Sequence, residues 1–148
     1  MKESALSVRR LTLPLSRRNI RDLEELQGLI YRKPQKLSQA DLERAIRARN
    51  VYIFVAVTPE GKIVAKGTIC LSRDELGVSA RLENIICSKA YRRQGLMTGI
   101  VSILLRLAKK RRPYIIHLLS HPFRRGAYAF YKKIGFLDSC VHGLVFPL

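Results

Sequence analysis

The chain has 148 residues, of which 47% are hydrophobic and 26% are charged. A chain of this length is typical of one domain with a sizeable core, and this composition excludes a disordered chain. The basic excess is unusual, because 28 Lys and Arg against 11 Asp and Glu give a formal net charge of +17. Such a surface attracts anions, so nucleic acid is an alternative partner; basic faces that are merely solvated are the other interpretation.

The positive charge is concentrated in the C-terminal half of the chain. No acidic residue lies between Glu83 and Asp138. The basic residues of the same stretch are Lys89, Arg92, Arg93, Arg106, Lys109, Lys110, Arg111, Arg112, Arg124, Arg125, Lys132 and Lys133. This half is therefore suited to a ligand that carries phosphate groups.

The cysteines and the apolar runs indicate in which cellular compartment the protein is expected. Cys70, Cys87 and Cys140 are odd in number and widely spaced, which favours neither a metal site nor a disulfide framework. We expect reduced thiols in a cytoplasmic protein that binds no metal. No apolar run approaches the roughly 20 residues of a membrane span, and the N-terminus MKESALSVRR lacks the hydrophobic region of a secretory signal. We therefore expect no contact with a membrane and no export.

The N-terminal half is predicted to alternate helices and strands. Ser16 and Ser38 each precede apolar residues at helical spacing, so each is expected to cap a helix. Runs rich in β-branched and aromatic residues predict strands. The expected elements are a strand over Ser7–Leu13, a helix over Arg17–Tyr31, a second helix after Ser38, a hairpin of Val51–Thr58 with Ile63–Leu71, and a polar loop over Ser72–Ser79.

The C-terminal half is predicted to continue as strand, helix, strand, helix and strand. The expected elements are a strand over Arg81–Cys87, a helix over Leu96–Lys110, a strand over Tyr114–Leu119, a helix over Arg124–Ile134 that stops at Gly135, and one or two strands at Phe136 and Cys140–Pro147. The order indicates an α/β domain with a mixed, mostly antiparallel sheet of six or seven strands, flanked by about four helices. The strand–helix–strand unit in its middle is expected to be a parallel crossover.

The strand over Arg81–Cys87 and the turn after it carry the strongest chemical signal. Simple alternation places Glu83, Ile85 and Cys87 on one face and the residues between them on the other. A carboxylate in an apolar strand is costly to bury, so Glu83 either lies at an exposed end beside a basic residue or faces a cleft in which it acts. Gly95 lets backbone approach a ligand at a helix N-terminus, which favours anions. The helix itself is expected to bury Met97, Val101, Leu104, Leu105 and Ala108.

Two segments resemble motifs of the GNAT superfamily of acetyl-CoA-dependent N-acetyltransferases. The residues ENIICSKAYRRQGLMTGIVSILL resemble its acetyl-CoA-binding motif, with Arg92 and Gly95 at the first and fourth positions of Q/R-x-x-G-x-G/A. The residues AYAFYKKIGF, from Ala127 to Phe136, resemble its second motif, A-x-x-F-Y-x-x-x-G-F. Met97 departs from the first pattern, which ends in Gly or Ala, and its side chain would either crowd the phosphates or enter the core.

The resemblance implies one GNAT-like domain over residues 1–148, with acetyl-CoA as cosubstrate. It implies that Tyr131 protonates the departing CoA thiolate and that Glu83 acts as the base, directly or through water. It places the pantetheine arm along the backbone of Ile85, Ile86 and Cys87. The other residues that it implies in cofactor binding are Arg92, Arg93, Gln94, Gly95, Leu96, Met97 and Thr98 around the pyrophosphate, with Tyr128 and Tyr131 from the second motif.

We therefore predict an N-acetyltransferase that moves an acetyl group from acetyl-CoA to an amine of an unidentified acceptor, a small molecule or a protein, by direct transfer in a ternary complex. The charge favours an acidic or phosphate-bearing acceptor. Two alternatives stay open, a nucleic-acid-binding module with a GNAT fold and a non-catalytic CoA-binding protein. A homodimer through the C-terminal strands is compatible with the sequence. His117, His121 and His142 carry weaker signals, because a lone histidine is usually structural or solvated.

Overall fold

The computed structural model describes residues 5–141 and 143–147; His142 lies outside them. The chain consists of two compact units, Met1–Leu118 and Leu119–Leu148. The first unit contains β1 (Ser7–Arg10), α1 (Arg17–Tyr31), α2 (Gln39–Arg47), β2 (Val51–Val57), β3 (Ile63–Asp74), β4 (Gly77–Cys87), the 3-10 helix η1 (Lys89–Tyr91), α3 (Leu96–Lys109) and β5 (Ile115–Leu118). The second unit contains α4 (Arg125–Lys133).

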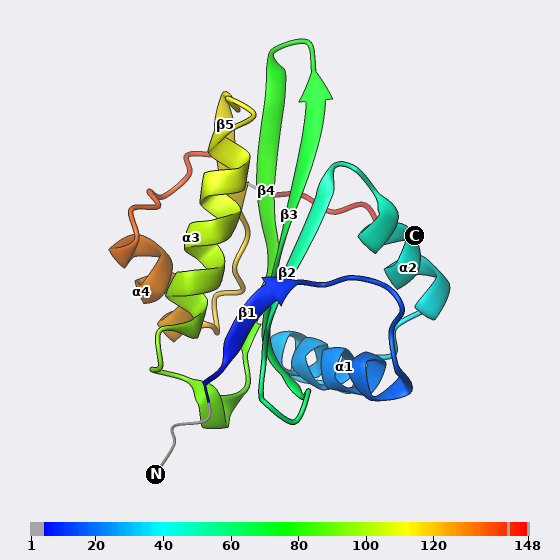
Figure 1. Ribbon diagram of the computed structural model, residues 1–148. Coiled ribbons are helices and arrows are strands. Elements are labelled where there is room, and N and C mark those ends of the chain that lie inside the picture. Colours follow the sequence, from blue (N-terminus) through cyan, green and yellow to red (C-terminus); the bar gives the residue numbers. More distant parts are fainter. Residues whose placement is uncertain (1–4, 142, 148) are drawn as a thin grey trace. The chain divides into compact units, whose positions relative to one another are not determined.

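The first unit is built on a five-stranded sheet in the order β1-β2-β3-β4-β5. The pairs from β1 to β4 are antiparallel, and β4 pairs with β5 in parallel after the chain has crossed over through α3. The predicted parallel crossover is thereby confirmed. Figure 1 shows α1 on one side of the sheet and α3 on the other.

The two N-terminal helices begin where the sequence predicts. Ser16 Oγ accepts from the Asn19 backbone N–H at 3.0 Å, and Asn19 Oδ1 accepts in return from the Ser16 N–H at 3.2 Å. Ser38 Oγ accepts from the Asp41 N–H at 3.2 Å. These bonds satisfy amides that the first helical turn cannot pair internally. They confirm both predicted caps.

Each face of the sheet carries its own part of the core. Leu23, Leu26 and Ile30 of α1 pack in one cluster with Val55 and Ile86 of the sheet, and α2 adds half-buried side chains to it. On the other face, α3 buries Leu96, Ile100, Val101, Leu104 and Ala108. The predicted stripe is therefore wrong for Met97 and Leu105, which are only half-buried. The helix lies on the sheet rotated toward Ile100, because the strands beneath it, and not the helix alone, decide which residues are covered.

The sheet has five strands in the described residues, which corrects the six or seven expected. Phe136 and the described part of Cys140–Pro147 form no strand. Leu137, Val141, Leu144, Val145 and Phe146 are each at least 75% exposed. Apolar and β-branched residues fit a strand only where a neighbouring strand edge accepts them, and the local sequence does not reveal such an edge.

The expected polar loop over Ser72–Ser79 is also wrong. β3 continues to Asp74 and β4 begins at Gly77, so only Glu75 and Leu76 connect them. Asp74 Oδ1 accepts from the Leu76 N–H at 2.8 Å, and Gly77 adopts a φ of 121°. A carboxylate that bonds backbone two residues on, followed by glycine, is typical of a tight turn. No helix in the described ranges is long and apolar enough to cross a membrane.

Candidate active site

A β-bulge interrupts β4 in the middle of the predicted motif. Thr68 of β3 lies opposite Glu83, and Lys66 lies opposite Ile86, so Asn84 and Ile85 together face Gly67. Asn84 has a left-handed backbone, with φ at 52°, a conformation that asparagine tolerates better than most residues. One extra residue on β4 reverses the direction of every side chain that follows.

The bulge corrects the predicted faces of β4. Residues opposite each other in a ladder share a face, so Glu83 and Ile86 lie on the α1 face with their partners Thr68 and Lys66. Cys87 pairs with Ala65 and lies on the other face. Simple alternation was therefore wrong in grouping Glu83 with Cys87.

The ladder between β4 and β5 ends just before the bulge in β4. β5 pairs only with Ser79–Leu82, and its last pair joins Leu118 to Leu82. β4 itself continues to Cys87. The parallel ladder thus stops one residue before Glu83, and the strand then passes through the bulge.

The turn from β4 into α3 has room for an anion. Arg92 Nε donates to the Cys87 carbonyl at 3.2 Å, and the backbone turns through positive φ at Arg93 (61°) and Gly95 (76°). No described side chain caps the first turn of α3, so its amides face outward with the positive end of the helix dipole. A Cβ placed on Gly95 or Gly99 would meet no heavy atom within 4 Å.

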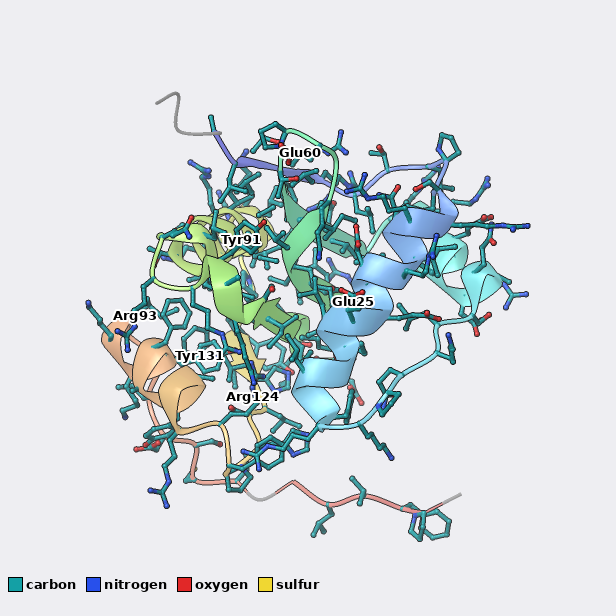
Figure 2. The ribbon with its side chains drawn as sticks, turned by 90° about the horizontal axis from the view of Figure 1, so that it is seen from below. Glu25, Glu60, Tyr91, Arg93, Arg124 and Tyr131 are labelled. Atoms are coloured by element: carbon teal, nitrogen blue, oxygen red, sulfur yellow. The ribbon has the colours of Figure 1, made fainter. Side chains whose placement is uncertain are left out.

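Figure 2 shows Tyr91 and Arg93 on this turn. The cationic side chains, the uncapped amides and the open space beside both glycines fit a pyrophosphate group. The residues that would hold it are those that the sequence motif indicates, from Arg92 to Thr98. Met97, which departs from the motif, is half-buried in the first turn of α3.

Glu83 lies within β4 and not at its end. Its side chain is 33% exposed and forms an ion pair with Arg81 Nε, two residues away on the same face. Its other oxygen, Oε2, accepts from the Cys70 thiol at 3.5 Å. The structure therefore places a basic residue beside Glu83, as one of the two interpretations requires, while leaving the carboxylate partly accessible.

The cysteine thiols are poor nucleophiles in this structure. Burial and the nearby Glu83 carboxylate raise the pKa of Cys70 to about 11. Burial also raises the pKa of Cys87, and the nearby Arg92 only partly opposes this effect. The thiolate is the reactive form of cysteine, so neither residue is poised for covalent catalysis. The exposed Cys140 is a free thiol, as are the other two.

Tyr131 is a buried phenol of the second unit. Only 5% of the residue is exposed, and its ring meets those of Phe130 and Phe136 edge-on at centroid distances of 5.5 and 6.1 Å. Burial raises the pKa of Tyr131, and the Arg124 charge opposes this effect. The phenol therefore stays protonated at neutral pH. Figure 2 shows Arg124 before α4 and Tyr131 within it.

Tyr128 has different surroundings in the same helix. It is 51% exposed, and its hydroxyl donates to Asp138 Oδ1 at 2.6 Å. Lys132 Nζ binds the other oxygen of Asp138 at 3.1 Å. Asp138, the first acidic residue after Glu83, is thus used within the second unit.

Sequence reasoning missed a buried lysine beside the bulge. Lys66 is 7% exposed, and burial lowers its pKa to about 8. Its ammonium donates to Gln27 Oε1 at 2.5 Å, and Gln27 Nε2 donates to Asn84 Oδ1 at 2.9 Å. The detectable signal was a lysine within the apolar run IVAKGTI of a predicted strand, since lysine is almost never buried without a partner.

Basic side chains also gather along the outer face of α3. Ser102, Leu105, Arg106, Lys109 and Lys110 line a shallow groove. Nearby on the sheet, the Arg10 guanidinium lies 4.6 Å above the centre of the Tyr52 ring, and Arg111 donates to the Tyr52 hydroxyl at 3.2 Å. In the part of the chain that the structure describes, no cluster of three His, Cys, Asp or Glu side chains could hold a metal ion.

The sheet, the bulged strand and the uncapped helix define an α/β protein in which the turn after β4 has room for an anion. Residues 19–136 match the model of the acetyltransferase (GNAT) family, and the chain belongs to that family. Members of this family use acetyl-CoA as cosubstrate. No curated protein sequence matches the chain.

Solved structures share the fold along almost the entire chain. An acetyltransferase from Trypanosoma brucei superposes with a TM-score of 0.76 at 21% identity, covering 97% of this chain and 100% of the other. An aminoglycoside antibiotic 6'-N-acetyltransferase from Acinetobacter baumannii gives 0.75 at 17%, covering 97% and 99%. Glucosamine-6-phosphate N-acetyltransferase from Arabidopsis thaliana gives 0.72 at 18%, covering 96% and 98%. At these identities the similarity establishes the fold alone.

Proposed function

We propose that the protein is an acetyl-CoA-dependent N-acetyltransferase that transfers the acetyl group directly to an acceptor amine in a ternary complex. The observation that carries this proposal is the path from the bulged β4 through the Gly95 turn into the uncapped α3. This path pairs a strand edge with an anion site. Both are needed for a ligand that has an amide-containing arm and a pyrophosphate.

The donor site would use mainly backbone. The pantetheine arm would lie along Ile85, Ile86 and Cys87, beyond the point at which the β5 ladder ends. The amides from Arg93 to Thr98 would bind the pyrophosphate, with the Arg92 and Arg93 charges nearby. Arg92 would also fix the turn through its bond to the Cys87 carbonyl. Tyr128 is the further contact that the second motif suggests.

The reaction forms a bond between the amine nitrogen and the acetyl carbon and breaks the bond between that carbon and the CoA sulfur. Glu83 would accept the proton that the amine loses, directly or through a water molecule. Its ion pair with Arg81 would hold the carboxylate in place. Tyr131, whose raised pKa keeps its proton at neutral pH, would donate to the departing sulfur. Most of the acceleration would come from the positioning of two bound substrates.

The acceptor is proposed to be an amine that carries a phosphate or another anionic group. The net charge of +17 repels polycations and attracts anions. Among proteins of this fold, one is named for aminoglycoside substrates and another for glucosamine-6-phosphate. The charge of this chain favours an acceptor of the second kind. A cytoplasmic location and a homodimer stay predictions.

Two measurements test the enzyme proposal. Acetyl-CoA should raise the thermal unfolding temperature, because a ligand that binds only the folded state stabilises it. Release of free CoA thiol should then depend on the added amine, with phosphate-bearing amines preferred over neutral analogues. Absence of a thermal shift would contradict both the enzyme and the non-catalytic CoA-binding alternative. A thermal shift without thiol release across a broad amine panel would favour the non-catalytic alternative.

Nucleic-acid binding is the second candidate function. It is supported by the basic groove of α3 and by Tyr52, which lies between Arg10 and Arg111. Binding of this kind depends steeply on salt, because each neutralised phosphate releases counterions. A mobility-shift titration on duplex and single-stranded DNA and RNA at 50 and 200 mM salt would measure it. Replacement of Lys109 and Lys110 by Gln should weaken the binding and reduce its salt dependence.

A further inference from the structure

A chain of three polar side chains connects the interior of the sheet to the bulge in β4. It begins at Lys66 in β3, passes through Gln27 in α1 and ends at Asn84 in β4. Lys66 and Gln27 are 7% and 8% exposed. We call these three residues the bulge relay. They lie far apart in the sequence, and only the packing of α1 onto the sheet brings them together.

The order of donors and acceptors in the bulge relay is set by Lys66. An ammonium group can only donate hydrogen bonds. Gln27 must therefore turn its carbonyl oxygen toward Lys66, which leaves its amide NH₂ to donate toward β4. Asn84 consequently accepts through Oδ1. The protonated lysine thus selects one orientation of Gln27 and, through it, one orientation of Asn84.

Asn84 is the residue that gives β4 its bulge. Its backbone is left-handed, with φ at 52°, and such a conformation persists where the surroundings fix it. Gly67 opposes the bulge from β3. The part-buried side-chain hydrogen bond from Gln27 to Asn84 stabilises this conformation against a regular strand, in which all later residues would be shifted by one.

A buried lysine is a costly way to achieve this. Burial penalises its charged form, and its hydrogen-bond partner is neutral. Asp22, the acidic side chain that α1 buries, accepts instead from the Ile63 N–H at 2.9 Å. A methionine would fill the same volume without this penalty. The cost is consistent with a role of Lys66 in positioning rather than in stability.

We propose that Lys66, acting through Gln27, holds the Asn84 bulge in the conformation that acetyl-CoA requires, so that Lys66 and Gln27 are positioning residues for the acyl donor. The proposal rests on the proposed function, because it concerns the same donor site. Ile85 is the second residue of the bulge, and Ile86 and Cys87 follow it directly. The backbone of these three residues is the expected partner of the pantetheine arm. An error of one residue in their register would present the wrong groups to that arm.

The experiment is a double-mutant cycle on acetyl-CoA affinity, measured by calorimetry without an acceptor. Its members are the wild type, Lys66→Met, Asn84→Gly and the double variant. Glycine adopts a positive φ without strain but has no side chain for Gln27 to hold. Lys66→Met should weaken binding about tenfold in the wild type and by less than about twofold in Asn84→Gly, because residues of one network are not additive.

Two further variants keep the test decisive. Gln27→Met should weaken acetyl-CoA binding as Lys66→Met does. The control is Lys62→Met, which replaces a lysine that directly precedes β3 and whose side chain is 43% exposed. This control should leave acetyl-CoA affinity unchanged. Thermal unfolding and the Asn84 amide NMR signals should show that Lys66→Met is folded but altered at the bulge. Equal affinity in Lys66→Met and wild type, or additive losses in the cycle, would overturn the positioning role alone. A wild type that does not bind acetyl-CoA would overturn the proposed function as well.

Discussion

Gly67 lies directly beneath Ile100, where α3 packs on the bulged region of the sheet. A Cβ added to Gly67 would lie 2.8 Å from Ile100 Cγ2 and 3.0 Å from both Ile85 Cδ1 and Leu104 Cδ1. The Ile100 contact is closer than real Cβ atoms show, and the two contacts at 3.0 Å are tighter than usual. The absence of a side chain at Gly67 therefore allows α3 to pack close to the bulge. It also affects the position of the turn around Gly95, which connects β4 to α3.

Gly67→Ala should destabilise the protein by about 1–3 kcal/mol, because overpacking forces the surrounding side chains or α3 to move. Urea unfolding followed by circular dichroism measures this loss. Gly99→Ala is the matched control, since a Cβ there meets no heavy atom within 4 Å, and alanine in a helix should stabilise by roughly 0.5–1 kcal/mol. Equal stability of Gly67→Ala and wild type would show that α3 adjusts freely.

Gly95→Val should remove detectable acetyl-CoA binding while leaving a folded protein. A β-branched residue is strained at a φ of 76°, by about 1–2 kcal/mol, and its side chain enters the space proposed for the pyrophosphate. Calorimetric titration with acetyl-CoA measures the effect. Gly61→Val carries a similar strain, at a φ of 84° in the turn before β3, and should bind normally. Retained affinity in Gly95→Val would refute the phosphate role of this turn.

Tyr131→Phe should lower the turnover number roughly 100- to 10,000-fold, as expected when a general acid is lost, and should change acetyl-CoA affinity little. The phenylalanine keeps the packing with Phe130 and Phe136. Steady-state kinetics from pH 6 to 10, together with direct binding, separate the two effects. Tyr114→Phe removes an exposed hydroxyl that bonds Asp74 and serves as the control. Full turnover of Tyr131→Phe across this range would exclude Tyr131 as the acid.

Lys66 should make the free energy of unfolding depend on pH in the alkaline range. Its pKa is about 8 in the folded protein against an ordinary value of 10.5. Between these values the unfolded chain binds more protons, so the Lys66 contribution to stability rises with pH from about 8 to 10.5. The full span corresponds to about 3 kcal/mol. This contribution of Lys66 to stability is lost below pH 8, where the buried amine is charged.

Denaturant unfolding of the wild type and Lys66→Met at several pH values measures this contribution as the difference between the two proteins. The free energy of unfolding of the wild type should rise relative to that of Lys66→Met as the pH increases from about 8 to 10.5. Lys62→Met removes a partly exposed lysine, so its free energy of unfolding should depend on pH in the same way as that of the wild type. A constant difference between wild type and Lys66→Met would mean that Lys66 titrates normally in the folded state.

The local sequence was sufficient for most element boundaries. The Ser16 and Ser38 caps, the Val51–Val57 strand and the Gly95 turn each depend on side chains within a few residues of the backbone that they stabilise. Interactions of such short range can be recognised without knowledge of the fold. The turn around Gly95 was also predicted in this way, because a glycine before an amphipathic helix is a local pattern. The role of Arg92 to Thr98 in phosphate binding stays a prediction.

Tertiary structure alone decided the features that depend on neighbouring strands. The bulge at Asn84 appears only when β4 is paired with β3, and it reversed the predicted face of Cys87. The expected strand over Cys140–Pro147 failed in its described part for a related reason, since strand propensity without a strand edge makes no ladder. The burial of Lys66 required α1 to cover the sheet. Local patterns therefore determined the elements and the turn around Gly95, while long-range pairing determined the register of the strand that leads into that turn.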